Sequence, residues 1–153
     1  NKDKMFALTL RMTGDREAAL DLMQDTFFTA FKEIGRFRGD ADFSSWLYRI
    51  ASNKALNYLK RKKILSFIPL TDKARDSISY EMPDYIDGEG LNKEITLAVN
   101  SLPPKQKLVF NLRFYEQLPF GEIAGILNKS ESTVKTNYQK AIEKLRKKLE
   151  GFR

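Results

Sequence analysis

The side chains best suited to binding chemistry occur in WLYRIASNKALNYLKRKK, residues 46–63. At α-helical spacing, one face of this stretch carries only basic and amide side chains, namely Arg49, Asn53, Asn57 and Lys60. Cationic groups neutralise phosphates, and amides hydrogen-bond base edges or the nucleic-acid backbone. Because the stretch contains no acidic residue, it differs from a solvated face on which opposite charges alternate. The pattern indicates a helix that binds an anionic partner.

A second set of polar side chains occurs in SESTVKTNYQKAIEKLRKKL, residues 130–149. Apolar positions such as Val134, Ala141 and Leu145 form one stripe, and the opposite side or its flank carries Ser132, Lys135, Thr136, Gln139 and Lys140. A short helix over 120–127, a tight turn and this long helix follow the helix-turn-helix plan, in which the second helix enters the major groove. There, Gln pairs with adenine and Lys with guanine. The alternative is a pair of packed helices without a role in DNA binding.

Composition narrows the classes of function. The 153 residues carry a net charge of +7, which favours nucleic acid or an acidic protein as partner. The absence of cysteine and histidine excludes disulfides, the usual zinc clusters, thiol nucleophiles and imidazole catalysis. The acidic residues are dispersed, so we expect no metal, no cofactor, no small-molecule substrate and no enzymatic activity. No apolar run reaches the ~18 residues of a membrane span, and we expect a soluble cytoplasmic protein without membrane insertion.

The sequence pattern predicts that every element that positions these side chains is a helix. Gly14 and Asp15 separate the first two helices, Ser44 can cap the basic helix, Pro104 suits a first helical turn, and Ser130 can cap the last helix. Helical segments are predicted at 1–12, 16–34, 46–63, 91–100, 103–115, 120–127 and 130–149. We therefore predict an all-α fold of two small helical domains, residues 1–66 and 91–153, joined by a flexible acidic linker, residues 67–90.

Four motifs in this order resemble a known family. They are DLMQDTFFTAF, FRGDADFSSWLYRIASNKALNYLKRKK, SLPPKQKLVFNLRFYEQLPFGEIAGIL and STVKTNYQKAIEKLRKKL. Together they are similar to the extracytoplasmic-function (ECF) sigma factors of bacterial RNA polymerase. The resemblance covers nearly the whole chain, and the order and spacing of the motifs make it specific.

The resemblance implies a role for each segment. The core polymerase, through its β′ clamp and β subunits, would be bound by a surface that includes Asp21, Gln24, Asp25 and Phe27. The minus-ten promoter element would be recognised and melted by Gly39, Asp40, Phe43, Ser44, Ser45, Arg49, Asn53, Asn57, Lys60 and Arg61, with the loop from Gly39 to Ser45 holding an unstacked base. The minus-thirty-five element would be read by Ser132, Thr133, Lys135, Thr136, Gln139 and Lys140.

As a whole, the resemblance implies an alternative sigma factor that directs core RNA polymerase to promoter DNA. It also implies control by an anti-sigma factor, which could hold the protein near the inner membrane and away from the nucleoid. One departure from the family is Asn137, where many members have arginine, so the resemblance does not extend to a phosphate contact at this position. The aromatic residues Phe37, Phe43 and Trp46 could stack on bases, but Trp46 is better interpreted as a core anchor beside Ile50.

Three other functions are compatible with parts of the pattern. A stand-alone helix-turn-helix repressor or activator would bind paired half-sites as a dimer, without polymerase. A nucleic-acid-processing enzyme would need a carboxylate cluster or an activated nucleophile. A membrane-surface helix would need the apolar face of residues 46–63 to be free of packing partners.

Overall fold

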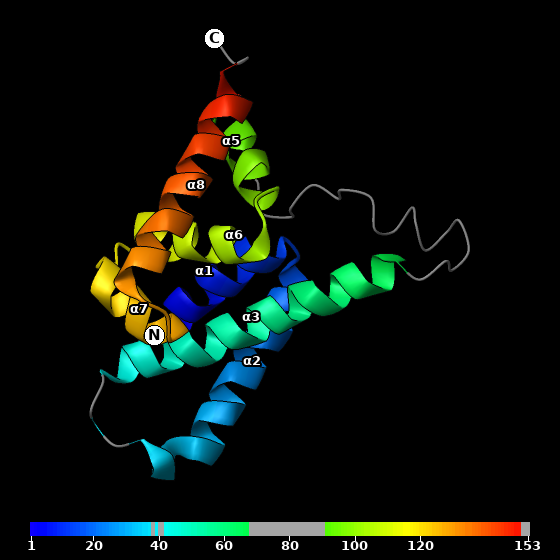
Figure 1. Ribbon diagram of the computed structural model, residues 1–153. Helices are drawn as coiled ribbons and strands as arrows, with labels where there is room; N and C mark the ends of the chain where they lie inside the picture. The colour runs from blue at the N-terminus through cyan, green and yellow to red at the C-terminus, as the bar shows by residue number, and fades with distance from the viewer. Residues whose placement is uncertain (38, 40–41, 68–90, 151–153) are drawn as a thin grey trace.

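The structure is a computed structural model that describes residues 1–37, 39, 42–67 and 91–150. Its elements, shown in Figure 1, are α1 (Lys2–Thr13), α2 (Arg16–Glu33), the 3₁₀ turn η1 (Ile34–Arg36), α3 (Phe43–Phe67), α5 (Leu91–Asn100), α6 (Pro104–Phe110), the π-helical turn η2 (Asn111–Tyr115), α7 (Phe120–Leu127) and α8 (Glu131–Leu149). These ranges contain no strand, and the predicted all-α fold is confirmed. Asp40 and most of the predicted linker lie outside the described residues.

Local capping explains where several helices begin and end. Gly14 adopts the left-handed conformation (φ 70°) and ends α1, as its position in the sequence predicted. The Asp15 carboxylate accepts a hydrogen bond from the Ala18 N–H at 3.2 Å, and the Ser130 hydroxyl oxygen accepts one from the Thr133 N–H at 3.1 Å. Both side chains satisfy N–H groups that have no partner within their helices.

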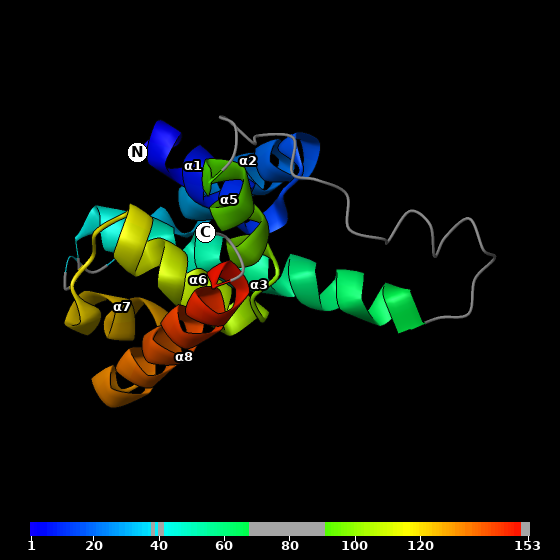
Figure 2. The same ribbon diagram turned by 90° about the horizontal axis from the view of Figure 1, so that it is seen from above.

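The first three helices pack through small and flexible side chains. Leu47, Ala51 and Ala55 on α3 are buried, and so are Met5 and Met12 on α1. Successive alanines on one face allow α3 to approach its neighbours closely, while methionine fills irregular gaps. The C-terminal end of α3 extends beyond the other helices, as Figures 1 and 2 show. Within the described ranges, no helix combines the length and the apolar character that crossing a membrane requires.

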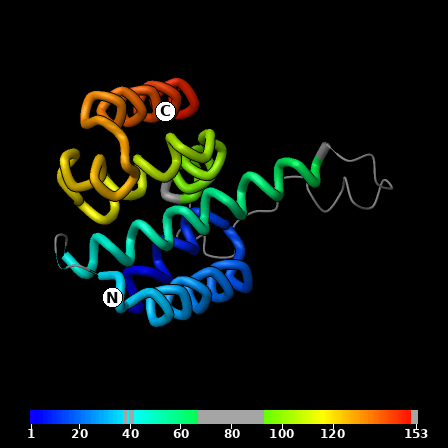
Figure 3. The backbone as a smooth tube through the Cα atoms, turned by 60° about the horizontal axis from the view of Figure 1, so that its bottom comes forward, coloured from blue at the N-terminus to red at the C-terminus, as the bar shows by residue number. Residues whose placement is uncertain are grey.

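The helices that follow the predicted linker pack directly against α1 and α3. One cluster of buried side chains runs from Met5 and Leu8 of α1 to Leu108, Leu112 and Ile123 of α6, η2 and α7. In Figure 3, α1 and α3 lie between α2 on one side and the C-terminal helices on the other. We call this packing of α6, η2 and α7 on α1 and α3 the closed arrangement. A second cluster lies within the C-terminal helices and includes Val99, Phe110 and Leu145.

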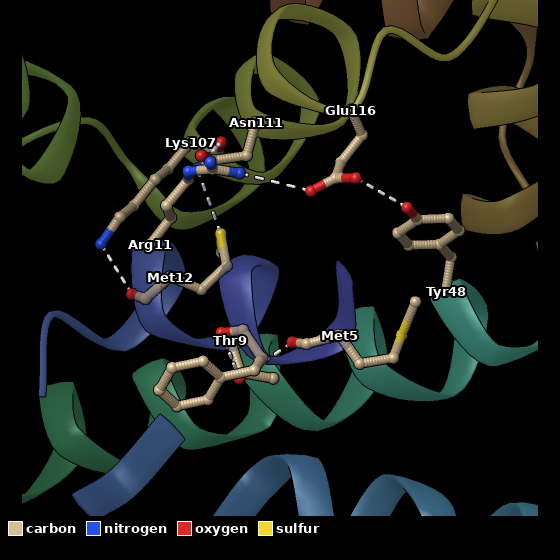
Figure 4. Close-up of polar contacts among 9 residues, drawn as sticks. Met5, Thr9, Arg11, Met12, Tyr48, Lys107, Asn111 and Glu116 are labelled. Carbon is tan, nitrogen blue, oxygen red and sulfur yellow. Dashed lines mark hydrogen bonds and ion pairs between the residues drawn. The ribbon is translucent and has the colours of Figure 1, made fainter. Parts of the chain in front are cut away.

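Glu116, directly after η2, links α1 and α3 at this interface (Figure 4). Its Oε1 lies 3.3 Å from the Arg11 guanidinium on α1, and its Oε2 accepts a 2.7 Å hydrogen bond from the Tyr48 hydroxyl on α3. The Glu116 side chain is only 8% exposed, so solvent screens these contacts weakly. Burial, and then the hydrogen bond to the Glu116 carboxylate, raise the pKa of Tyr48. The Arg11 guanidinium also lies 4.1 Å from the centre of the Tyr115 ring.

Lys107 on α6 makes a second buried contact between the two halves. Its ammonium donates hydrogen bonds to the carbonyl oxygen of Met12, at the end of α1, and to Asn100 Oδ1, both at 2.7 Å. The α1 C-terminus carries partial negative charge, which suits a cation. Even so, burial and then the nearby charge of Lys62 lower the pKa of Lys107 to about 7.

This pKa predicts a pH dependence of stability. Unfolded Lys107 keeps its proton up to a pKa near 10.5, whereas the folded residue loses it near 7, so stability rises with pH between these values. We expect Lys107 to make the protein about 2 kcal/mol more stable at pH 9 than at pH 7. Urea unfolding at both pH values, with Lys107→Met as reference, measures this difference. The chain has no histidine or cysteine side chain that would titrate in the same range. An equal change in the free energy of unfolding with pH for the wild-type protein and Lys107→Met would contradict the prediction.

Candidate nucleic-acid interface

The basic face of α3 points to solvent. Arg49, Asn53, Asn57 and Lys60 are all exposed, as is Arg61 beyond them. The opposite face is the one buried against α1 and α2, because it carries the apolar side chains. The division between a basic face and a packed face, predicted from residues 46–63, is confirmed. The packing of the apolar face also excludes the membrane-surface interpretation of this helix.

Three aromatic rings gather where the chain enters α3. The Phe37 ring lies 5.8 Å from Phe43 and 5.2 Å from Trp46, measured between ring centres. Trp46 is half-buried and packs against the core, while Phe43 is 37% exposed and is free to meet a flat ligand. Gly39 is exposed and has a φ of +73°. A residue with a side chain would be strained in this backbone conformation.

The two serines of the predicted minus-ten loop make contacts within the chain. The prediction that Ser44 caps α3 is wrong, because α3 begins at Phe43 and the Ser44 hydroxyl instead donates to Asn1 Oδ1 at 3.1 Å. The Ser45 hydroxyl donates to the Glu122 carboxylate on α7 at 2.7 Å. In the closed arrangement, α7 therefore lies directly against the start of α3.

The polar face of α8 is also open to solvent. Val134, Ala141 and Leu145 are buried, and the exposed residues on the other side are Ser132, Thr133, Lys135, Thr136, Gln139 and Lys140. Between α7 and α8, Asn128 takes the left-handed conformation (φ 53°) that a tight turn requires. The predicted helix-turn-helix is confirmed in its geometry, with α8 as the helix that could enter a major groove.

A third surface, on α2, is acidic and aromatic. Asp21, Gln24 and Asp25 are exposed, and Asp25 forms a 2.8 Å ion pair with Lys54 on α3. Phe27 is half-buried and packs against the core. The fully outward aromatic side chains are instead Phe28, 62% exposed, and Phe31, 79% exposed, followed by Ile34 at 55%.

At helical spacing from Leu22 and Phe27, Phe31 and Ile34 fall on the apolar stripe of α2, and Phe28 falls outside it. The C-terminal end of α2 extends past α1 and α3, so no part of the described chain covers that end of the stripe (Figure 1). An exposed aromatic pair beside acidic side chains is typical of a protein-binding surface. The signal in the sequence was the adjacent pair Phe27-Phe28: neighbours on a helix point about 100° apart, and Phe28 falls outside the stripe that Leu22, Met23 and Phe27 form.

Comparison with known families divides the chain into two parts. Residues 1–64 match the family described as Sigma-70 region 2, and residues 92–145 match the family described as Sigma-70, region 4. The fold and its two exposed polar helix faces thus define a protein of the sigma-70 class.

Individual relatives narrow the class. The chain is 31% identical to the ECF RNA polymerase sigma factor SigW of Bacillus subtilis, covering 97% of this chain and 84% of the relative. It is also 31% identical to the RNA polymerase sigma-H factor of Pseudomonas aeruginosa, covering 96% and 81%. The fold resembles the sigma factor RpoE solved in complex with the anti-sigma factor NepR from Bartonella quintana, with a TM-score of 0.73, 19% identity, and coverage of 99% and 93%. The chain belongs to the ECF sigma factors, and it is an alternative sigma factor.

Proposed function

We propose that this sigma factor binds core RNA polymerase through α2, engages the minus-ten element through α3 and its preceding loop, and reads the minus-thirty-five element through α8. The observation that carries the proposal is the presence of two separate exposed basic and amide-bearing helix faces, on α3 and α8, beside a third acidic and aromatic surface on α2. Each face has the chemistry of its partner: cations for phosphates, amides for base edges, and aromatic anchors for protein. The protein itself carries out no covalent step.

The residues at the start of α3 have side chains suited to opening the minus-ten element. Unstacking a base costs about a few kcal/mol, and stacking on an aromatic ring returns roughly 1–3 kcal/mol per base. Phe43 is the exposed ring at this position, and Arg49 follows it on the same helix. We propose that the segment from Gly39 to Ser45, whose last three residues begin α3, holds the extruded base while Asn53 and Asn57 keep the strand in register.

Docking on the polymerase is assigned to α2. We propose that its acidic residues and the exposed Phe28 and Phe31 bind the β′ clamp, with further contacts to the β subunit made by the C-terminal helices. The proposed domains are residues 1–66 and 91–153, with the linker 67–90 between them. In analogy to the solved complex of RpoE with NepR, we propose that an anti-sigma factor holds this protein inactive in the cytoplasm, near the inner membrane or free, until release to the nucleoid.

The closed arrangement must open for this function. Elements centred near minus ten and minus thirty-five lie about 25 base pairs apart, which is about 85 Å of duplex at 3.4 Å per base pair. A compact chain of 153 residues has a radius of gyration of about 15 Å and cannot reach both elements. The segment between Phe67 and Leu91 can extend to at most ~80 Å. This length permits the two halves to separate, so that each can bind its own promoter element while they remain covalently connected.

Run-off transcription with core RNA polymerase tests the proposal directly. Core enzyme plus this protein should initiate at a cognate promoter that core enzyme alone ignores. Specific, tight binding of duplex DNA by a dimer of this protein, together with no association with core polymerase, would instead favour the stand-alone helix-turn-helix regulator.

The paired asparagines of α3 give a sharper prediction. Replacing Asn53 and Asn57 together with alanine should slow open-complex formation by about tenfold, since each lost hydrogen bond to DNA costs about 1 kcal/mol or more. Both side chains are exposed, so folding should be unaffected. Permanganate footprinting of melted thymines measures the effect. On a promoter whose minus-ten element is already unpaired the defect should shrink, and an unchanged rate on the duplex promoter would exclude these residues from the site.

A further inference from the structure

A groove between the two halves of the chain has no ligand in the proposed function, although two of its lining residues, Asn57 and Lys60, also belong to the proposed DNA-binding face. It lies between the C-terminal part of α3 and the start of α6, with Asn137 of α8 at one side, and its volume is about 550 Å³. Pockets for small ligands measure about 300–1,000 Å³ and occur preferentially at interfaces between domains. The size and position of this groove are therefore those of a ligand site.

The groove combines an apolar wall with a basic rim. Leu56 and Leu59 of α3 line it together with Pro103 and Pro104 at the start of α6, so both elements contribute apolar surface. Lys60, Lys63 and Lys105 line the same groove and are exposed, and none of its described lining residues is acidic. An apolar slot with several ammonium groups at its rim fits a molecule with a flat ring system at one end and phosphates at the other.

Amide groups supply hydrogen bonds at the apolar part. Asn57, Gln106 and Asn137 all line the groove, one from each of the three helices. The Gln106 Oε1 is buried and has no hydrogen-bond partner in the described structure. A buried acceptor without a partner is costly, and a donor from a ligand would satisfy it. The exocyclic amino and ring N–H groups of nucleobases are such donors, and side-chain amides pair with their edges.

From these observations we propose that the groove binds a nucleoside phosphate, with its base between the leucine and proline walls and its phosphates on the three lysines. Because α3 and α6 both contribute, the ligand binds the closed arrangement and stabilises it by mass action. It also occupies Asn57 and Lys60, which face promoter DNA in the proposed function. A nucleoside phosphate, free or at the end of a nucleic-acid strand, is thus an inhibitor of opening. The binding itself requires neither polymerase nor promoter.

Equilibrium binding to the full chain tests this proposal. ATP, GTP, inorganic triphosphate and a short single-stranded oligonucleotide are the probes, measured by calorimetry or fluorescence anisotropy. We expect saturable one-to-one binding of at least one nucleoside triphosphate, with inorganic triphosphate at least about tenfold weaker because it has no base. Binding of the oligonucleotide but of neither nucleotide would keep the nucleoside-phosphate chemistry and assign the ligand to a strand end.

Matched charge reversals separate the groove from general electrostatics. Lys105→Glu and, independently, Lys63→Glu should each weaken binding by at least about tenfold, because each removes a phosphate contact and adds repulsion. Lys4→Glu makes the same change in net charge on α1, away from the groove, and should alter binding less than about twofold. The proposal would be overturned if all three variants weakened binding equally, if inorganic triphosphate bound as tightly as the nucleoside triphosphates, or if no probe bound. A chain that binds nucleotide but fails in run-off transcription would leave this inference intact and refute only the proposed function.

Discussion

Bridging positions 11 and 116, after Arg11→Cys and Glu116→Cys, is expected to reduce promoter-dependent transcription by about a hundredfold or more, because one of two specific DNA contacts is lost. These side chains face each other across the closed arrangement, one from α1 and one just after η2. A covalent bridge keeps the two halves packed, and the packed chain is too short to contact both promoter elements. Cleavage of the bridge should restore activity in the same molecules.

The chain is well suited to this experiment. It contains no cysteine of its own, so the introduced pair supplies the only thiols. Charged side chains whose tips are 3.3 Å apart have backbones too distant for a direct disulfide, so a short bis-thiosulfonate reagent is the suitable bridge, and a reductant cleaves it. Because the bridged and cleaved forms share both substitutions, the loss of the native ion pair cancels in the comparison.

A bridge within one half provides the matched control. The side chains of Ser101, directly after α5, and Lys148 on α8 contact each other, and both belong to the C-terminal half. Ser101→Cys with Lys148→Cys, bridged in the same way, should retain transcription to within about twofold, since opening does not require α5 and α8 to part. Full activity of the chain bridged at 11 and 116 would show that the closed arrangement is compatible with initiation, and the need for opening would be refuted.

Features set by neighbouring residues were predictable from the sequence. Gly14, Asp15 and Ser130 end or begin helices through contacts within a few residues, and helical periodicity alone placed Leu47 and Val134 inward. The exposed polar faces of α3 and α8 follow from the same periodicity. Ser44 is not the cap because α3 begins at Phe43, two residues earlier than a cap at Ser44 requires, and helix boundaries are difficult to predict to within one or two residues.

Features set by distant residues were not predictable in this way. Glu116 meets Arg11 and Tyr48 across 105 and 68 positions of sequence, and no local pattern encodes that meeting. The burial of the Lys107 amine could not be predicted either, because a lysine in a short amphipathic helix is ordinarily solvated. These long-range contacts limit prediction of the site more than prediction of the fold. The contact of Ser45 with Glu122, which places α7 against the start of α3, depends on how the two halves pack.

Phe31 illustrates the same limit and leads to the second large expected effect. Periodicity assigns it to the apolar stripe of α2, but whether a stripe is covered depends on how far the neighbouring helices extend. At 79% exposure, an aromatic side chain on the helix that also carries the exposed Asp21 and Asp25 is more readily explained by a protein partner than by folding. Aromatic anchors at the centre of interfaces often contribute 2 kcal/mol or more to binding, whereas charged rims contribute less.

Phe31→Asp should therefore weaken binding to core RNA polymerase by about 30-fold or more, and Phe28→Asp with it should remove measurable binding. Stability should change by less than about 0.5 kcal/mol, because the replaced side chain makes few contacts in the free protein. Ile64→Asp, a similarly charged change at an exposed apolar residue on the far end of α3, is the control and should leave affinity unchanged. Anisotropy titration of labelled sigma factor with core enzyme, in the absence of DNA, measures the three affinities. Equal affinities for the Phe31 and Ile64 variants would mean that the polymerase contacts α2 only through its polar residues, because the exposed aromatic pair would then contribute nothing to docking.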